Sequence, residues 1–503
     1  MKRITLLLLA LLTSLAFAGK GNDTLNVAFE RTMLTFDTYA TSERLTLILA
    51  HNFGDTLIHR NPVSGAFEPH LATAWRALDD LTFEFDLRTD VTFHNGEAFG
   101  PDDVVATLTY VITDGAELPG TGPLQWIDHV EAVDDDTVRI HAKSITPTAY
   151  ESLALIGIIY PAGVLASEGA VALGQSPVGT GPYRFVGVDG NTIRFERFDD
   201  YFVGAKQMPA IANLVIHTLP EESSRIASLM TGDIDIARSG SISPDQAAAI
   251  GGRARIEAAD ILRIWFVQMD SLGRSGETFF TDARVRQAVA HAIPRDEIVD
   301  VLLSGYGRKI DTPCNPVQFG CDPEAAVVYE YDPERAKELL AEAGYPDGFT
   351  VDIYGYRDQQ VAQAIQGYLE QVGIRTNLQW YGGQYDVVAQ LLAAGELPLY
   401  VGSWGSSSVY DASAVLNIHF EQGEVGEFTV GTSDTIDAAV RAALQTVDLD
   451  ERMDLYTAAI HEITDEAYMF PLYAGRVVAG VSNDVVWQPS PDEIERYYNA
   501  TWR

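Results

Sequence analysis

Basic residues and cysteines are scarce in this sequence. Its 503 residues include 34 Lys and Arg against 71 Asp and Glu, which gives a net charge of −37, and only two cysteines. A chain this acidic repels nucleic acids and anionic membrane surfaces, so we expect no nucleic-acid partner. Two interpretations of the charge stay open: a solvated acidic shell that keeps the protein soluble, or attraction of cationic ligands.

Long apolar runs are absent except at the N-terminus. There a basic start precedes an apolar stretch over residues 4–17, and residues 16–18, Ala-Phe-Ala, have the small-x-small form of a cleavage site. This pattern predicts a secretory signal peptide over residues 1–18, and a buried N-terminal helix is the alternative. Gly19 stands where a lipid-anchored protein would carry Cys. We therefore expect a soluble periplasmic or otherwise extracytoplasmic protein without a lipid anchor.

Catalytic motifs are also missing. Neither a G-x-S-x-G nucleophile turn nor a G-x-x-x-x-G-K-[ST] phosphate loop occurs, and no second histidine completes the H-E-x-x-H motif that His461 and Glu462 begin. Acidic pairs such as Asp79-Asp80 lie at turns, where capping and solvation explain them. We therefore expect neither an enzyme nor a bound metal or cofactor. A secreted hydrolase with a dispersed pair of carboxylates remains the alternative from another class.

The two cysteines lie close together, as Cys314 and Cys321 in PCNPVQFGCDP. In a secreted protein, such a pair framed by Pro and Gly predicts a local disulfide. A zinc site would need further ligands, and no histidine is near in the sequence. We expect the bond to staple a loop and to have no redox role.

Hydrophobic periodicity predicts a mixture of strands and helices. Alternation over residues 25–29, 137–142 and 192–198 predicts strands. Residues 282–293 carry an apolar helical stripe, and Asp332-Pro333-Glu334 is a capped helix start. The mixture predicts the α/β class. The chain is too long for one hydrophobic core, so we expect two or three domains.

One stretch combines several of these signals. In residues 81–105, an alternating strand with Phe83, Phe85 and Leu87 on one side leads through a His-Asn-Gly turn to a helix that Pro101 opens. Acidic residues after that proline face the positive end of the helix. The stretch carries no catalytic chemistry and so predicts architecture more than activity.

This stretch opens an ordered series of short motifs that covers nearly the whole chain after residue 18. In that order the motifs resemble the extracellular solute-binding proteins, family 5, of ABC importers, which include dipeptide-, oligopeptide- and nickel-binding proteins. The later motifs are PVGTGPY at 177–183, GDID at 232–235, DARVRQAVAHAIPR from 282, YDPERAKELLAEAGY from 331 and VGI at 372–374.

The resemblance implies an α/β, two-lobed fold like that of periplasmic binding proteins, with a cleft that closes by hinge motion. It also implies an extra domain inserted early in the first lobe. From the motif positions we predict that lobe I comprises residues 19–55, 177–272 and 465–503, that the inserted domain comprises 56–176, and that lobe II comprises 273–464.

The resemblance further implies a solute-binding role. The protein would capture a small solute, with peptides as the leading class, and deliver it as a monomer to an ABC permease in the membrane. An oligosaccharide or another polar solute, such as an opine, is the alternative, because aromatic faces and hydroxyls also suit sugars. A nickel chelate has less support, because no His or Cys cluster maps to the candidate ligand loop.

Residues 400–411, YVGSWGSSSVYD, form the candidate ligand loop. Its glycines permit a close approach to the backbone, and its hydroxyls and aromatic faces offer polar and flat apolar contacts. A flexible Ser/Gly surface loop with a core tryptophan is the alternative. The candidate ligand residues in the loop are Ser403, Trp404, Ser406, Ser407 and Tyr410.

The loop departs from the peptide binders that it resembles. In those, an Asp three residues after the Trp receives the ammonium group of the peptide. Here that position is Ser407, which favours a neutral polar ligand unless Asp411 supplies the carboxylate. Tyr473 and Glu30 are further candidate ligand residues. A core position for Tyr473 and a surface pair of Glu30 with Arg31 are the alternatives.

Overall fold

The computed structural model describes residues 19–113, 118–422 and 428–503, without the side chains of residues 244, 245 and 407. The predicted signal peptide lies outside this part of the chain. Among the described residues, no helix combines the length and the apolar character needed to cross a membrane.

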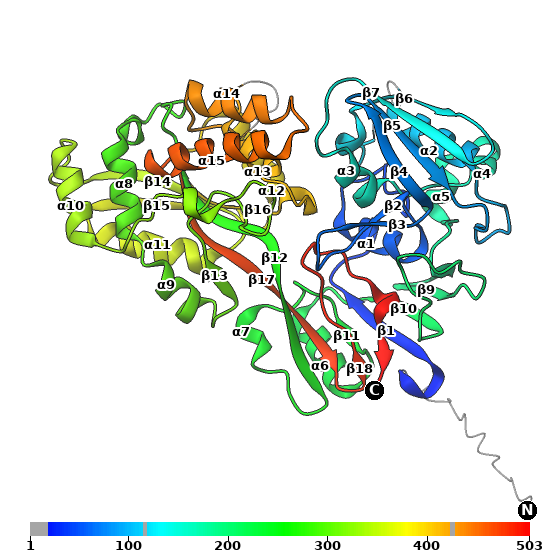
Figure 1. Cartoon of the computed structure of the whole chain (residues 1–503). Coiled ribbons are helices and arrows are strands. Elements are labelled where there is room, and N and C mark those ends of the chain that lie inside the picture. The colour runs from blue at the N-terminus through cyan, green and yellow to red at the C-terminus, as the bar shows by residue number, and fades with distance from the viewer. Residues whose placement is uncertain (1–18, 114–117, 423–427) are drawn as a thin grey trace, which may run out of the picture.

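Two long antiparallel strands, β12 (Ala254–Met269) and β17 (Met469–Ser482), connect the two lobes (Figure 1). β17 pairs with β11 at one end, and β12 pairs with β16 at the other. A bulge interrupts the β12–β17 ladder between Asp260 and Ile264. We place the passage between the lobes within these strands; the predicted boundaries just outside them stay predictions.

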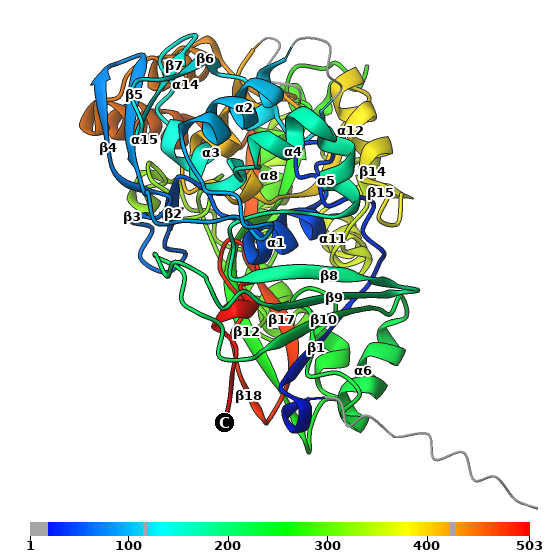
Figure 2. The same ribbon diagram turned by 90° about the vertical axis from the view of Figure 1, so that its right-hand side faces the viewer.

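Lobe I contains the mixed sheet β11-β1-β10-β9-β8, and Figure 2 shows its outer strands below the inserted domain. The elements of this lobe are α1 (Arg44–Phe53), α6 (Glu222–Thr231), α7 (Pro244–Ala247), β1 (Thr24–Phe29), β8 (Tyr183–Asp189), β9 (Thr192–Arg197), β10 (Asn213–Thr218), β11 (Ile236–Ala237), β18 (Val485–Val486) and β19 (Thr501–Trp502).

Lobe II contains the strands in the order β15-β14-β16-β12-β17, and β13 pairs with β17. The strand β14 is parallel to both of its neighbours, so helices make the crossovers. The elements of this lobe are β13 (Gly307–Lys309), β14 (Phe349–Gly355), β15 (Ile374–Trp380), β16 (Leu399–Trp404), α8 (Ala283–Ala292), α9 (Arg295–Glu297), α10 (Pro333–Glu342), α11 (Gln359–Gln371), α12 (Tyr385–Ala394), α13 (Ser413–Phe420), α14 (Asp434–Ala443) and α15 (Leu449–Asp465).

The inserted domain contains an antiparallel sheet in the order β4-β5-β7-β6, with α2 packed against β6 and β7. Its elements are β2 (Ile58–Arg60), β3 (Phe67–Pro69), β4 (Ala72–Asp79), β5 (Thr82–Leu87), β6 (Ile127–Ala132), β7 (Thr137–Ala142), α2 (Pro101–Ile112), α3 (Ala149–Ile156), α4 (Ala162–Ser167) and α5 (Ala170–Gln175).

The predicted strand, turn and helix of residues 81–105 are confirmed. In β5, Phe83, Phe85 and Leu87 are all buried. The helix α2 begins at Pro101, and the Asp103 carboxylate accepts a hydrogen bond of 2.9 Å from the backbone N–H of the preceding glycine. The predicted strands at 25–29, 137–142 and 192–198 and the helices after 282 and 332 are also present, to within a residue or two.

The PVGTGPY motif forms a turn where lobe I meets the inserted domain. A Cβ atom on Gly179 would lie 2.2 Å from the Phe53 carbonyl oxygen, so only glycine permits this close approach. His94, from the turn of residues 81–105, reaches the same motif, because its Nε2 lies 2.9 Å from the Gly181 carbonyl oxygen. Two of the motifs that carry the family resemblance thus contact each other.

The buried apolar residues divide the molecule differently from the sheet. One cluster runs through both the inserted domain and lobe I, from Leu25 to Ala500. Two clusters lie in lobe II, and a fourth belongs to lobe I. Among the described residues, no cluster has buried members in both lobe I and lobe II. The inserted domain and lobe I therefore share a core. Between the two lobes, among the described residues, only the partly buried Tyr306 of lobe II packs against an apolar cluster of lobe I.

Candidate functional site

The predicted ligand loop lies where β16 ends, beside the strands that join the lobes. In the β12–β16–β17 register, Trp265 pairs with Ser403 on one side and with Tyr473 on the other. Their side chains therefore share one face of the sheet. The Trp265 and Tyr473 rings are stacked, with their centroids 5.0 Å apart. Two of the predicted ligand residues, Ser403 and Tyr473, thus come together on this face.

The loop after β16 contacts both other parts of the molecule. The Tyr410 hydroxyl donates a hydrogen bond of 2.9 Å to the Pro62 carbonyl, and the Arg60 guanidinium lies 4.2 Å from the centre of its ring. The Ser408 hydroxyl donates to the Asp492 carbonyl and accepts from Arg44, both at 2.5 Å. The lobe-II loop therefore bridges to lobe I and to the inserted domain.

A small pocket lies where these three parts meet. Its wall combines polar and apolar side chains, and the bridging loop contributes Ser408 and Tyr410. Arg60 and Glu151 form an ion pair in its wall, and burial lowers the pKa of His51 to about 3, so that this imidazole is neutral. The lining residues are His51, His59, Arg60, Glu151, Ala154, Leu155, Ser408, Tyr410, Asp492 and Arg496.

Several buried polar atoms at this junction have no hydrogen-bond partner within the described part of the protein. Such atoms are uncommon in folded proteins and mark places where a partner is missing. Three of them, His51 Nδ1, Arg60 Nε and Arg496 Nε, belong to residues that line the pocket. Three more, Arg263 Nε, Trp265 Nε1 and Ser406 Oγ, belong to the face and loop at the end of β16.

Charges of both signs meet beside the same face. Arg263 Nη2 of β12 lies 3.6 Å from Glu493 Oε2, which belongs to the C-terminal segment of lobe I. Burial raises the pKa of Glu493, but Arg263, Arg44 and Arg357 together outweigh it, so the pKa lies below its usual value. Glu493 is therefore a carboxylate at neutral pH. In a chain of net charge −37, this concentration of arginines is a local reversal of sign.

The predicted residue Asp411 does not face an open space. Its side chain is buried, and Arg452 donates to it at 2.7 Å, Tyr456 at 3.2 Å and the Ser413 backbone at 3.0 Å. These contacts occupy both carboxylate oxygens within lobe II. The structure thus gives no support to Asp411 as the replacement acid for a ligand ammonium.

Trp404 is likewise engaged within lobe II. Its indole N–H donates to the Ala414 carbonyl at 2.6 Å, and its ring packs edge-on against His419 and Phe428. These contacts agree with the alternative interpretation of Trp404 as a packed core residue. The side chain of Ser407, on which the expected shift in specificity depended, lies outside the described residues.

The remaining predicted residues differ in their surroundings. Ser406 is fully buried, with a left-handed backbone at φ 52°. Burial raises the pKa of Tyr473 well above its usual value, and its hydroxyl lies 3.4 Å from Asp358. Glu30, predicted as a ligand residue with a surface pair to Arg31 as the alternative, instead forms a double hydrogen bond with Arg238, at 2.9 and 3.0 Å.

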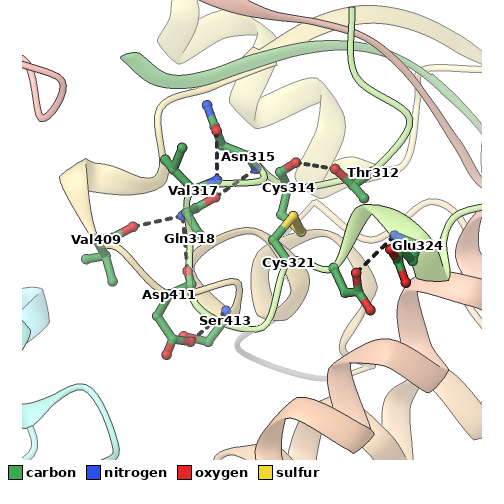
Figure 3. The surroundings of a disulfide bond; sticks show 11 residues. Thr312, Cys314, Asn315, Val317, Gln318, Cys321, Glu324, Val409, Asp411 and Ser413 are labelled. Atoms are coloured by element: carbon green, nitrogen blue, oxygen red, sulfur yellow. Dashed lines mark hydrogen bonds between the residues drawn. A yellow bond between two sulfur atoms is a disulfide. The ribbon is translucent and has the colours of Figure 1, made fainter. Parts of the chain in front are cut away.

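The two cysteines are joined in a disulfide, as the sequence predicted (Figure 3). The loop that they close reaches the bridging loop, because the Gln318 side chain donates to the carbonyls of Val409 and Asp411 at 2.8 and 3.1 Å. The disulfide loop thus supports the backbone of the candidate ligand loop from behind.

Sequence reasoning missed Arg263, Trp265 and Glu493. One signal was present: Arg263 interrupts an otherwise apolar strand, ILRIWFV. An arginine at a core position of a strand needs a special partner. Glu493 gave no comparable signal. Among the described residues, no group of three or more His, Cys, Asp or Glu side chains could hold a metal ion.

Residues 66–427 match the family described as bacterial extracellular solute-binding proteins, family 5 Middle. The chain belongs to this family. Its members are the solute-binding components of ABC importers, and the match extends over most of the chain. The resemblance found in the sequence motifs is thereby confirmed.

Curated relatives are similar to this chain over most of their own length. The glutathione-binding protein GsiB of Pectobacterium atrosepticum is 27% identical over 441 residues, which cover 84% of this chain and 83% of that protein. The heme-binding protein A of Haemophilus influenzae is 26% identical, and the match covers 80% of this chain and 78% of that protein. The di/tripeptide-binding protein 2 of Pseudomonas aeruginosa is 26% identical and covers 93% of each.

Solved structures of low sequence identity have the same fold. HbpA2 from Haemophilus parasuis has a TM-score of 0.83 at 21% identity, with 95% of this chain and 100% of that chain covered. A dipeptide-binding protein from Pseudoalteromonas sp. SM9913, in complex with Met-Leu, has a TM-score of 0.77 at 24% identity. The match covers 95% of this chain and 100% of that chain. The two-lobed periplasmic-binding-protein fold is therefore shown.

Proposed function

We propose that this protein captures a peptide-like solute between lobe I and lobe II and delivers it, chemically unchanged, to the ABC permease. As part of this proposal, the mature protein begins at Gly19, is soluble and extracytoplasmic, and carries no lipid anchor. The names of the relatives support peptides as the ligand class, since glutathione and di- or tripeptides are what those proteins are said to bind.

The observation that carries this proposal is the set of unpartnered buried polar atoms at the junction of the lobes. Arg263, Trp265 and Ser406 each bury such an atom near the end of β16. A solute with hydrogen-bonding groups would supply the missing partners, and burial between the lobes would exclude water from the contacts.

We assign the ligand contacts to one face of this junction. Ser403, Ser406 and Tyr473 come from the sequence prediction, and Arg263, Trp265 and Glu493 from the structure. Glu30 lies at the lobe-I side, where Arg238 neutralises its charge. In this proposal the main role of three other loop residues is to hold the loop in place rather than to contact the ligand: Trp404, Tyr410 and Asp411. The role of Ser407 stays a prediction.

A thermal-shift screen of the mature protein against di- and tripeptides, sugars and amino-acid derivatives tests the proposal. A peptide at about 100 times its Kd stabilises the protein by roughly 2.7 kcal/mol. Mass spectrometry of the recovered peptide should show no chemical change. Failure of every peptide to raise Tm, or hydrolysis of a peptide that binds, would contradict the proposal.

A matched pair of variants locates the site. Arg263→Gln should weaken the peptide found in the screen by roughly tenfold or more, because it removes charge-assisted hydrogen bonds in a buried place. Arg335→Gln is the control, since Arg335 lies exposed on α10 and pairs with Glu338 and Glu342. Equal affinities of the two variants would move the site away from Arg263.

A further inference from the structure

We propose that Arg263 and Glu493 are the specificity-determining residues of this site. They form an ion pair between the lobes that a zwitterionic ligand separates, placing its carboxylate on Arg263 and its ammonium on Glu493. This inference rests on the proposed function of the junction as the ligand site, and it names the acid that replaces the one missing at Ser407.

Arg263 and Glu493 are buried together but only loosely paired. Arg263 Nη2 and Glu493 Oε2 are 3.6 Å apart, while their side chains are only 14% and 13% exposed. That separation exceeds a charge-assisted hydrogen bond, which is typically 2.7–2.9 Å. The Nε atom of Arg263 is buried without a partner. Both side chains are thus largely removed from water, although the distance between them is longer than a hydrogen bond.

Four other acidic side chains near the junction are more tightly engaged. Arg496 holds Asp492 through two hydrogen bonds of 2.7 and 2.9 Å, and Ser239 and Tyr497 both donate to Glu495. Glu30 is held by Arg238, and Asp411 by Arg452. An incoming ammonium group would have to break these hydrogen bonds. Among the described residues, Glu493 instead lies 3.6 Å from Arg263 and is otherwise held only by the charges of neighbouring arginines.

Three residues around the pair have a strained backbone. Glu493 has a left-handed backbone, with φ 59°, and so do Ser406 and Ser408 at 52° and 67°. Such conformations cost energy in residues other than glycine and are concentrated at functional sites. A Cβ atom on Gly405 would lie 2.6 Å from Arg263 Nη2, so the guanidinium packs directly on this glycine.

The buried pair selects against ligands that carry only one charge. A ligand with a carboxylate alone would bind Arg263 but make no contact with Glu493. A ligand with an ammonium alone would bind Glu493 but not Arg263. Each blocked form therefore loses one charge-assisted hydrogen bond in a buried place, and the pair favours the zwitterion over both.

The experiment measures the affinity of the dipeptide Met-Leu and of its N-acetyl and C-amide forms by calorimetry, with wild type, Arg263→Gln and Glu493→Gln. For wild type, we expect each blocked form to bind roughly tenfold or more weakly than Met-Leu. With Glu493→Gln, N-acetylation should change the affinity little, whereas C-amidation should weaken binding as in wild type. With Arg263→Gln, C-amidation should change the affinity little, whereas N-acetylation should still weaken binding.

A control pair lies on the same strand. Arg255 and Glu257 of β12 form an ion pair of 2.6 Å, with side chains 22% and 21% exposed, in the lobe-I part of the strand. Glu257→Gln should leave the affinities of all three peptides unchanged. The double variant Arg263→Gln with Glu493→Gln keeps the local charge balanced. If a single variant does not fold, the double variant should bind the two blocked forms about as well as Met-Leu.

The outcomes separate this inference from the proposed function. The assigned pairing is wrong, and the site itself stands, if Met-Leu binds but blocking either end leaves its affinity unchanged. The same holds if N-acetylation still weakens binding to Glu493→Gln, or amidation still weakens binding to Arg263→Gln, as much as it does for wild type. If none of the three peptides binds wild type, both fail for this dipeptide, and the screen of peptides and sugars then decides the proposed function alone.

Discussion

Lobe I meets the inserted domain and lobe II through two junctions that differ in kind. At the first, the fully buried Asp55 accepts hydrogen bonds from Lys206 at 2.7 Å, His70 at 2.8 Å and Thr180 at 2.9 Å. One apolar core surrounds this network and continues through both parts. At the second, a few side chains bridge the lobes, several buried polar atoms lack partners, and the lobes share no buried apolar cluster among the described residues.

The comparison indicates which junction is rigid and which one permits motion between the parts it joins. Satisfied buried charges within a common core are costly to separate, so the inserted domain should move with lobe I as one body. Polar contacts that leave donors unused cost little to separate, so lobe II can move about β12 and β17. We therefore expect ligand binding to act at the second junction and to leave the first unchanged.

The largest expected effect breaks the first junction. Asp55→Asn leaves the Lys206 ammonium buried without its counter-charge, and we expect a loss of roughly 3–5 kcal/mol in the free energy of unfolding. Burial opposes the charge of Asp55, but Lys206 and His70 outweigh it and lower its pKa, so the lost interaction is ionic at neutral pH. Urea unfolding followed by fluorescence measures the change.

The control for this variant is Asp200→Asn, at an exposed position in a turn. It should change the unfolding free energy by less than about 0.5 kcal/mol. If Asp55→Asn is as stable as this control, the network does not join the inserted domain to lobe I, and the contrast between the junctions disappears.

The next effect concerns lobe II alone. Replacing both cysteines, Cys314→Ser with Cys321→Ser, should reduce stability by about 2–3 kcal/mol, the value for a short closed loop. Because this loop supports Val409 and Asp411 from behind, peptide affinity should fall as well. Thermal unfolding and calorimetry check the two effects, and unchanged values for both would remove the disulfide from this account.

Much of the fold could be predicted from the sequence. Capped helix starts such as Asp332-Pro333 and alternating strands such as Phe83 to Leu87 depend on neighbours in the chain, and the structure has them as expected. The passage of β12 and β17 between the lobes was not predictable in the same way, because a strand has the same local pattern whichever sheet it joins.

The site was less predictable than the fold. The motif around Trp404 located the loop, but the contacts of Asp411 with Arg452 connect residues 41 positions apart, and the pair of Arg263 and Glu493 connects residues far more distant in the chain. Sequence spacing contains no information about such pairs. Besides the Trp404 motif, the charged residue within an apolar strand was a local sign of the proposed site.

A buried histidine provides a pH test of lobe II. His419 is buried among aromatic rings, with neither ring nitrogen hydrogen-bonded, and burial lowers its pKa to about 3. In the unfolded chain its pKa is about 6.5. Between these values the unfolded state binds the proton and the folded state does not, so stability falls as the pH falls below about 6.5.

His419→Phe should remove this contribution. From pH 7.5 to pH 5, the variant should lose about 2 kcal/mol less stability than wild type, because pH 5 lies about 1.5 units below the pKa of the unfolded histidine and each unit contributes about 1.4 kcal/mol. Urea unfolding at the two pH values measures it. Peptide affinity at pH 7.5 should stay within a few-fold, since His419 lies in the body of lobe II. An identical pH dependence of the two proteins would show that His419 is not held neutral.

The smallest expected effect weakens the second junction. Tyr410→Phe removes the hydrogen bond to the Pro62 carbonyl and keeps the ring beneath Arg60. We expect a loss of about 1 kcal/mol or less in stability and a larger radius of gyration in solution scattering without peptide. A radius equal to that of wild type would show that this contact does not hold the lobes together.

Hydrogen–deuterium exchange of the mature protein with and without a bound peptide tests the central claim most directly. We predict that the peptide increases protection at the second junction, in residues 261–265, 403–410 and 490–495. Residues 51–57 and 204–206, at the first junction, should exchange equally in both states. Protection that increases around Asp55 and Lys206, or that leaves the β16 end unchanged while the peptide is bound, would contradict the account.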